Sequence, residues 1–340
     1  MNFFSSFNSS YFSRALVLGE SIKKHHSQST LWAIIVERKN SIEIPGELYE
    51  LYDEIIYAED LFNNSFDQFV FGLNVVEACT AVKGAALNYI LEQGANKVIY
   101  LDPDIVLFNP LSEVEKLLES YSIILTPHQL DPEDEDDALA IIDNEICSLI
   151  HGAFNLGFLA ISNCHEAKRF TKWWSSRLSR YCHDKKIDGL FVDQKWCDLV
   201  PSFFEDVIIL RNPGYNVASW NLSKRLVSFK DDGNIYSNDV PLIFYHFTKL
   251  GPIGFYMTER YCRNHFDILE VWAWYNRTVE SKNQNIKPNQ LWSFGSYDDH
   301  SPIDYGARIL YRTREDLREA FPNPFECGIG SYKNWHVSNK

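Results

Sequence analysis

Cysteine is sparse in this 340-residue chain and follows no pairing pattern. The seven cysteines stand at positions 79, 147, 164, 182, 197, 262 and 327, and no Cys-x-x-Cys occurs. A full disulfide framework needs an even number of cysteines and a zinc knuckle needs a Cys-x-x-Cys pair, so the sequence predicts neither. Free thiols suit a reducing compartment, and we therefore expect a cytoplasmic protein.

An excess of basic charge and long apolar runs are also absent. The chain has 32 Lys and Arg against 46 Asp and Glu, a net charge of -14. This balance excludes an extended surface for nucleic acid or anionic membrane, but it permits a local phosphate site. No apolar run approaches the ~20 residues of a spanning helix, and the first residues lack the pattern of a signal peptide. We expect no transmembrane segment and no nucleic-acid partner.

The chain does have enough apolar residues for a large core, with 45% hydrophobic and 15% aromatic content. Apolar runs typical of buried strands alternate with stretches of helical period. Expected strands cover residues 3–7, 31–36, 54–58, 98–101, 122–125, 158–161, 207–210 and 242–246. Expected helices start at residue 12 and cover 75–91 and 112–119, and a further helix should contain Phe170, Trp173 and Trp174. This alternation indicates an α/β fold with a mixed, mostly parallel sheet flanked by helices.

The pattern changes near Gly-Pro-Ile-Gly at 251–254. Glycine and proline together interrupt regular elements, which suggests a boundary. We expect a main domain over residues 1–250. Residues 251–340, rich in Trp and Tyr, should form a helical and loop extension packed on it, with a helix around 259–280.

Two carboxylates end the predicted strand Val-Ile-Tyr-Leu, at Asp102 and Asp104. Side chains two positions apart on an extended backbone point to the same side, and the proline after Asp102 favours extended angles there. Ligands of open α/β sheets bind at the carboxyl edge of the strands. Paired hard oxygens suit Mn²⁺ or Mg²⁺, which can hold a diphosphate. We therefore predict that both acids are metal ligands.

A second interpretation of the same pair stays open. Apolar-Asp-x-Asp also opens haloacid dehalogenase-like phosphatases, in which Asp102 would be a nucleophile and Asp104 an acid/base. Their motif usually ends the first strand of the core, whereas here it follows residue 101. Another Asp-x-Asp, Asp134 and Asp136, lies in an acidic loop that no apolar strand precedes. We interpret that loop as a solvated one.

Further polar residues stand at predicted junctions between elements. His246 ends the last clear strand and could reach the same metal. Asn155, Asp193 and Gln194 could hydrogen-bond sugar hydroxyls, or could cap helices. Tyr11 follows the first loop and could stack on a nucleobase, or could cover the start of the helix.

Taken in order, these positions resemble the GT-A glycosyltransferases, and within them glycosyltransferase family 8. The matching segments are Tyr11, Thr-Ala-Val-Lys83, Leu-Asp102-Pro-Asp104, Phe-Asn155-Leu-Gly157, Val-Asp193-Gln194 and Tyr-His246-Phe. The likeness covers residues 1–250. It implies a GT-A (Rossmann-like) fold, with the aromatic-rich C-terminal extension added to it.

The resemblance implies a site for a UDP-sugar and Mn²⁺ or Mg²⁺. Asp102, Asp104 and His246 would hold the metal on the diphosphate. The expected catalytic residues, beside the anomeric carbon of the donor sugar, are Asp193, Gln194 and Asn155. Tyr11 would pack on uracil, and the other expected nucleotide-binding residues are Phe7, Asn8, Lys83 and Lys249.

The resemblance therefore predicts metal-dependent transfer of a hexose from a UDP-sugar to a hydroxyl of a glycan, a lipid-linked sugar or a protein, with retention of configuration. Two routes to retention stay open. Asp193 attacks as a nucleophile, or the acceptor enters on the leaving-group face and a phosphate oxygen takes its proton. Two other functions also stay open: a phosphatase with Asp102 as nucleophile, and a non-catalytic carbohydrate-binding module.

Overall fold

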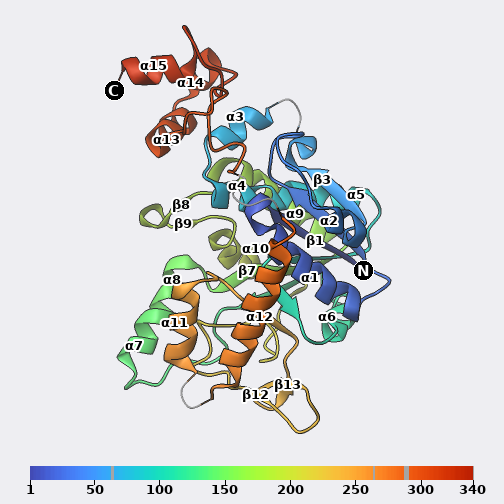
Figure 1. The fold of residues 1–340 in the computed structure, drawn as a ribbon. Helices are drawn as coiled ribbons and strands as arrows, with labels where there is room; N and C mark the ends of the chain where they lie inside the picture. The colour runs from blue at the N-terminus through green and yellow to red at the C-terminus, as the bar shows by residue number, and fades with distance from the viewer. Residues whose placement is uncertain (63–64, 263–264, 287–290, 340) are drawn as a thin grey trace.

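The computed structural model describes residues 1–340 except 63–64, 263–264, 287–290 and 340. A seven-stranded sheet lies at its centre, with helices on both faces (Figure 1). In spatial order its strands are β10 (Val207–Ile209), β6 (Ile123–Pro127), β7 (Phe154–Ser162), β4 (Lys97–Leu101), β1 (Asn2–Phe7), β2 (Thr30–Ile35) and β3 (Glu54–Tyr57).

Most neighbouring strands run parallel. The pairs β4–β1, β1–β2, β2–β3 and β10–β6 are parallel, whereas β7 is antiparallel to both β4 and β6. The predicted mixed, mostly parallel α/β sheet is confirmed. Strand β7 begins at Phe154, four residues before the predicted start, and so includes Asn155.

Side-chain alternation along the strands divides the core between the two faces of the sheet. In β4, Val98 and Tyr100 pack in one hydrophobic cluster, while Ile99 and Leu101 pack in the other. Burying each of these side chains contributes about 1.5–3 kcal/mol. A slip of one residue would exchange the two faces, so this pattern fixes the register of the strand that carries the acid pair.

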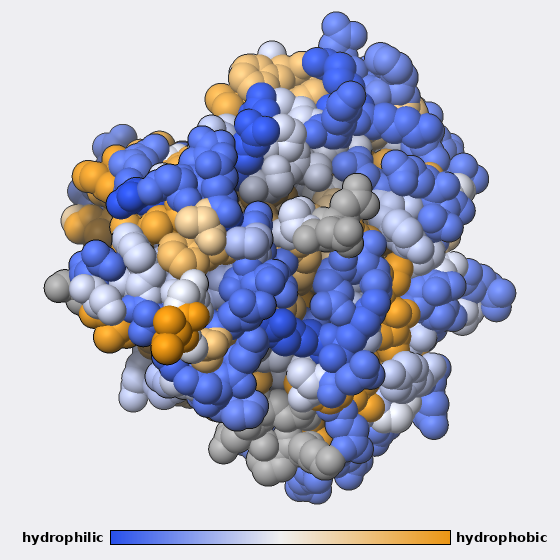
Figure 2. Space-filling view, turned by 90° about the horizontal axis from the view of Figure 1, so that it is seen from above, coloured by the Kyte–Doolittle hydropathy of each residue, from blue (hydrophilic) through white to orange (hydrophobic). Residues whose placement is uncertain are grey.

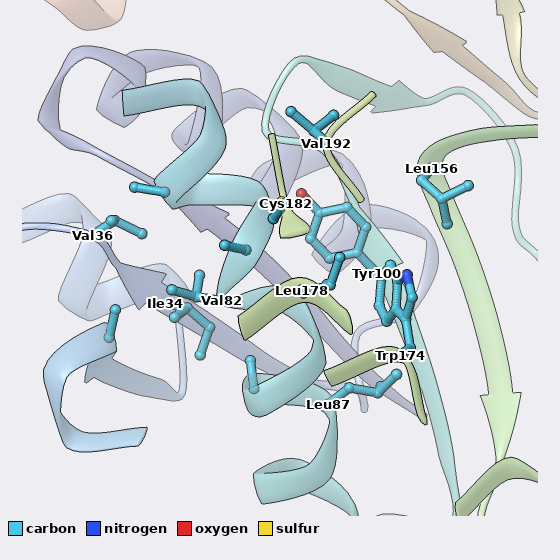
Figure 3. Close-up of a cluster of buried hydrophobic side chains, with 14 of the residues drawn as sticks. Ile34, Val36, Val82, Leu87, Tyr100, Leu156, Trp174, Leu178, Cys182 and Val192 are labelled. Carbon is cyan, nitrogen blue, oxygen red and sulfur yellow. The ribbon is translucent and has the colours of Figure 1, made fainter. Parts of the chain in front are cut away.

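Helices cover both faces. On the first face lie α4 (Val75–Ala81), α5 (Lys83–Glu92) and α9 (His165–Tyr181), and on the second lie α1 (Phe12–His25), α2 (Gly46–Leu51) and α6 (Ser112–Leu117). The single helix predicted for 75–91 is therefore two adjoining helices. Figure 3 shows Tyr100 of β4 among Leu87 of α5 and Trp174 and Leu178 of α9.

A second, three-stranded sheet adjoins the carboxyl end of β4. Its order is β11 (Val217–Ala218), β15 (Phe244–His246) and β5 (Ile105–Leu107), and β15 runs antiparallel to β5. Helices α11 (Pro252–Tyr261) and α12 (Asp267–Asn283) pack against this sheet. The prediction of a single helix around 259–280 is therefore wrong, because the chain forms two helices there.

The last part of the chain is tied to earlier elements by two arginines, of which Arg308 is buried. Arg308 of α13 (Tyr305–Thr313) donates to the carbonyls of Phe71 and Leu73, each at 2.9 Å. Arg312 lies 3.2 Å from the fully buried Glu77 of α4. Figure 1 shows α13, α14 (Glu315–Ala320) and α15 (Tyr332–Ser338) grouped at one end of the molecule, near α3 (Phe66–Phe71). The boundary at residue 250 stays a prediction.

The surface agrees with the charge composition. The face in Figure 2 is largely hydrophilic, with hydrophobic side chains in separate patches. Within the described parts of the chain, no helix has both the length and the apolar character needed to cross a bilayer. All seven cysteines lie in the described residues, and no disulfide joins any of them.

Candidate active site

Asp102 and Asp104 lie where β4 ends and the chain turns into β5. The Asp102 N–H donates to the Gly157 carbonyl at 2.8 Å, and the Asp102 carbonyl accepts from the Ile105 N–H at 3.1 Å. The Asp104 carbonyl accepts from the Phe247 N–H at 2.8 Å. Backbone hydrogen bonds to β7 and to the residue that follows β15 thus fix both acids at the sheet edge.

His246 reaches the same edge from β15. Its neighbours in the small sheet are Ile105 of β5 and Ala218 of β11. Its ring lies against Gly157, since a Cβ at position 157 would stand 2.5 Å from the His246 Cε1 atom. A side chain there would displace the imidazole, which explains why this position is glycine.

The side chains of these three residues converge. His246 Nε2 lies 3.1 Å from Asp104 Oδ1 and 3.7 Å from Asp102 Oδ2. One ligand atom from each residue lies within 4.8 Å of the other two. His246 and Asp104 are buried, while Asp102 is partly exposed. Two carboxylates and one imidazole suit Mn²⁺ or Mg²⁺ and leave coordination positions for phosphate oxygens, so the residues fit such a cation.

Charges within this triad shift the pKa values of its members. Burial alone would lower the pKa of His246, but the carboxylates of Asp104 and Asp102 outweigh it and raise that pKa. Burial alone would raise the pKa of Asp104, but the neighbouring imidazole lowers it. The opposite directions mean that a positive charge on the imidazole and a negative charge on Asp104 would stabilise each other.

Lys83, at the start of α5, is a buried cation behind the acid pair. Its Nζ lies 2.8 Å from Asp193 Oδ2 and 3.3 Å from Asp102 Oδ1, and it donates to the Leu156 carbonyl at 3.0 Å. Burial alone would lower its pKa, but the charges of Asp102 and Asp193 raise it well above the ordinary value. The Tyr100 hydroxyl also donates to Asp102. Lys83 thus links Asp193 to Asp102, one of the predicted metal ligands. Each of the three ammonium hydrogens of Lys83 has a partner within the protein.

Asn155 and Gln194 form a connected pair beside His246. Asn155 Nδ2 donates to Gln194 Oε1 at 3.2 Å, and Asn155 Oδ1 lies 3.2 Å from His246 Nδ1. Gln194 also bonds to two backbone groups, the Leu156 N–H and the His151 carbonyl, each at 3.1 Å. The structure therefore brings together the predicted Asn155, Gln194 and His246.

Tyr11 lies on the Asp104 side of the site. Burial, together with the charge of Asp104, raises the pKa of Tyr11 to about 12. The Arg14 guanidinium lies 4.3 Å from the centre of the Tyr11 ring. One ring face is thus covered by a cation, and a nucleobase would have to stack on the other face.

The remaining predicted nucleotide residues are placed differently. The Phe7 side chain is buried in the core, where its ring contacts Phe12 and Tyr52. Asn8 follows β1, is buried, and accepts a hydrogen bond from Ser10. Lys249 is exposed three residues after β15, in a left-handed backbone conformation with φ 53.

Sequence reasoning missed two aromatic neighbours of the triad. The Trp220 ring packs edge-on against His246, with centroids 5.3 Å apart, and His128 packs against Trp220 at 5.4 Å. Within the described residues, His128 Nδ1 and Trp220 Nε1 are buried without a hydrogen-bond partner. His128 directly follows β6. Asp102 was selected because it directly follows a predicted strand, and the same reasoning could have found His128. No comparable signal marks Trp220 within its loop.

The extension also reaches the site, through Tyr275 of α12. Its ring stacks on Phe247 with centroids 3.8 Å apart. Burial first, then the charge of Asp104, raises the pKa of Tyr275. Its buried hydroxyl has no partner among the described residues. The residues after 250 therefore contribute to the surroundings of the acid pair.

Two proteins of Bacillus subtilis (strain 168) resemble part of this chain. The uncharacterized protein YfnF is 25% identical over 175 residues, which is 51% of this chain and 56% of YfnF. The uncharacterized protein YfnD is 27% identical over 179 residues, 51% of this chain and 53% of YfnD. The chain spans about half the length of the curated relatives it matches.

Solved structures of glycosyltransferases are similar at low identity. The galactosyltransferase LgtC, in complex with donor and acceptor sugar analogs, is 16% identical with a TM-score of 0.49, covering 83% of this chain and 96% of LgtC. Mouse xyloside xylosyltransferase 1 is 15% identical with a TM-score of 0.43, covering 74% of this chain and 100% of its own.

A family match covers the part of the chain that carries most of the site. Residues 46–232 match the model of the nucleotide-diphospho-sugar transferases. This range contains Lys83, the acid pair, Asn155 and Asp193, and the match favours a transferase over the phosphatase and the binding module. The chain belongs to the nucleotide-diphospho-sugar transferase family.

Proposed function

We propose that the protein is a glycosyltransferase that depends on Mn²⁺ or Mg²⁺ and takes its sugar from a UDP-hexose. The observation that carries the proposal is the convergence of Asp102, Asp104 and His246 within 4.8 Å at the sheet edge. These three residues would hold the cation. When bound, it would stabilise the negative charge that develops on the departing diphosphate.

The nucleotide end of the donor belongs on the Tyr11 side. The face of the Tyr11 ring opposite Arg14 is the proposed stacking surface for uracil, and Arg14 adds a positive charge next to it. Asn8 lies beside this residue, because its carbonyl accepts from the Tyr11 N–H at 3.0 Å. Lys249, close after His246 in the chain, is the proposed additional contact to phosphate.

The reacting end of the donor sugar belongs beside Asp193. Burial raises the pKa of Asp193, and the Lys83 ammonium at 2.8 Å opposes this shift and favours the carboxylate. Both routes to retention remain within the proposal: attack by Asp193, or entry of the acceptor on the leaving-group face. Loss of transfer in Asp193→Asn with unchanged UDP affinity would support a catalytic place for Asp193. Unchanged turnover would contradict it.

The acceptor is proposed to be a hydroxyl of a glycan, a lipid-linked sugar or a protein. The ring nitrogens of His128 and Trp220 that have no partner among the described residues lie close to His246, and they favour a ligand rich in hydroxyl groups. Seven cysteines without a disulfide favour a cytoplasmic location.

Slow hydrolysis of candidate donors tests this proposal. UDP-, GDP- and TDP-sugars would be incubated with the protein and Mn²⁺, with EDTA as the control. We expect UDP-hexoses to be consumed fastest, and EDTA to stop the reaction. Preference for a GDP- or TDP-sugar would contradict the assigned nucleotide, and equal rates with EDTA would contradict metal dependence.

A further inference from the structure

The side-chain amide of Gln194 has only one possible orientation. One of its ends faces the Leu156 N–H at 3.1 Å, and the other faces the His151 carbonyl at 3.1 Å. A backbone N–H can only donate and a backbone carbonyl can only accept. The oxygen of Gln194 must therefore face Leu156, and its nitrogen must face His151 at the end of α8 (Cys147–His151).

This orientation fixes Asn155 in turn. Gln194 Oε1 lies 3.2 Å from the Asn155 amide, so the group that faces it must be the NH₂. The Gly157 N–H, a donor, lies 3.3 Å from the opposite atom of Asn155, which must be the oxygen. Two independent contacts therefore aim Asn155 Oδ1 at His246.

An oxygen at that position determines which nitrogen of His246 carries hydrogen. Asn155 Oδ1 lies 3.2 Å from His246 Nδ1 and can only accept, so Nδ1 carries the hydrogen. In the neutral ring, Nε2 then keeps its lone pair. Nε2 is the atom that faces Asp104 and Asp102. A metal ligand needs this free lone pair.

We propose that Asn155 is a positioning residue that selects the metal-binding tautomer of His246, and that Gln194 acts behind it by fixing the Asn155 amide. The inference rests on the proposed metal site. It gives both amides a task that differs from direct contact with the donor sugar. Asn155, Gln194 and His246 are all buried, where such hydrogen bonds are stronger than in water.

Metal affinity tests this role. Binding of Mn²⁺ alone would be measured by electron paramagnetic resonance for the wild type, Asn155→Leu and Asn163→Leu. Loss of an orienting partner typically weakens metal binding about 10–100-fold, which is the expectation for Asn155→Leu. Asn163 follows the other end of β7 and donates to the Ala95 carbonyl at 2.9 Å, so its variant should bind Mn²⁺ as the wild type does.

The tautomer itself gives a second test that needs no Asn155 variant. Long-range ¹H–¹⁵N spectra of histidine-labelled protein, at mildly alkaline pH and with diamagnetic Mg²⁺, would report it, with His246→Gln for assignment. Hydrogen on Nδ1 supports the inference, and hydrogen on Nε2 overturns it. Unchanged Mn²⁺ affinity in Asn155→Leu would overturn the positioning role alone. Absence of Mn²⁺ binding in the wild type would overturn both the proposed metal site and the positioning role of Asn155.

Discussion

Lys83 Nζ and Asp193 Oδ2 lie 2.8 Å apart in the interior, and each side chain is only 2% exposed. Lys83→Met would leave Asp193 buried without its cation and would also remove the contact to Asp102. Removing one partner of a buried pair costs about 3–5 kcal/mol. Urea unfolding should show a loss of this size.

The exposed pair Lys185–Asp188 supplies the control for this prediction. Lys185→Met should change stability little, because solvent screens that pair. The double variant Lys83→Met/Asp193→Leu should recover part of the loss, since it removes the stranded charge. A Lys83→Met loss no larger than that of Lys185→Met would contradict the account.

Gly157 is predicted to be essential for the triad through its lack of a side chain. In Gly157→Ala the added methyl would meet the His246 ring at 2.5 Å and displace it from Asp104. We expect Mn²⁺ affinity to fall at least about tenfold, as for other losses of ligand orientation. Gly46→Ala is the control, because no described atom lies within 4 Å of its added Cβ. Equal Mn²⁺ affinity in both variants would refute the steric argument.

Arg312 is predicted to hold the extension on the rest of the chain. Its guanidinium lies 3.2 Å from Glu77, which is fully buried, and Arg312→Met would leave that carboxylate without its cation. The expected loss is about 3 kcal/mol by chemical denaturation. Arg314→Met, which breaks the exposed pair with Asp316, should have little effect. A similar loss in both variants would mean that Glu77 does not need Arg312.

His128 is predicted to make stability depend on pH. Burial lowers the pKa of His128 to about 4, from 6.5 in an exposed histidine. The unfolded chain therefore binds the proton first, so stability is complete above pH 6.5 and falls as the pH drops towards 4. The shift corresponds to about 3 kcal/mol. Urea unfolding of the wild type should lose more stability than His128→Gln across this range, and parallel losses would count against the prediction.

The strands could be predicted because a buried strand appears in the sequence as a short run of apolar residues. The run at 98–101 became β4, and the two acids after it lie at the sheet edge. The direction of β7 could not be predicted, because alternation along a strand is the same in both directions. Nor does helical period reveal where one helix ends and the next begins, as the division between α11 and α12 shows.

The sequence suggested the candidate site residues one by one, but it did not show which of them contact each other. Asp104 meets His246 because β15 pairs with β5 in one register, with His246 opposite Ile105. Such pairing between distant segments depends on packing that a single sequence does not display. For the same reason the bond between Asn155 and Gln194, 39 residues apart, became visible only in the fold.

The most direct test of the metal site compares two Asp-x-Asp pairs in one protein. Asp102→Asn/Asp104→Asn alters the pair beside His246, whereas Asp134→Asn/Asp136→Asn alters the exposed acidic loop. The measurement is the rise in melting temperature that UDP and Mn²⁺ together produce. We predict that the rise is lost in the first variant and kept in the second. A full rise in the first variant, or no rise in the wild type, would contradict the proposed metal-dependent site.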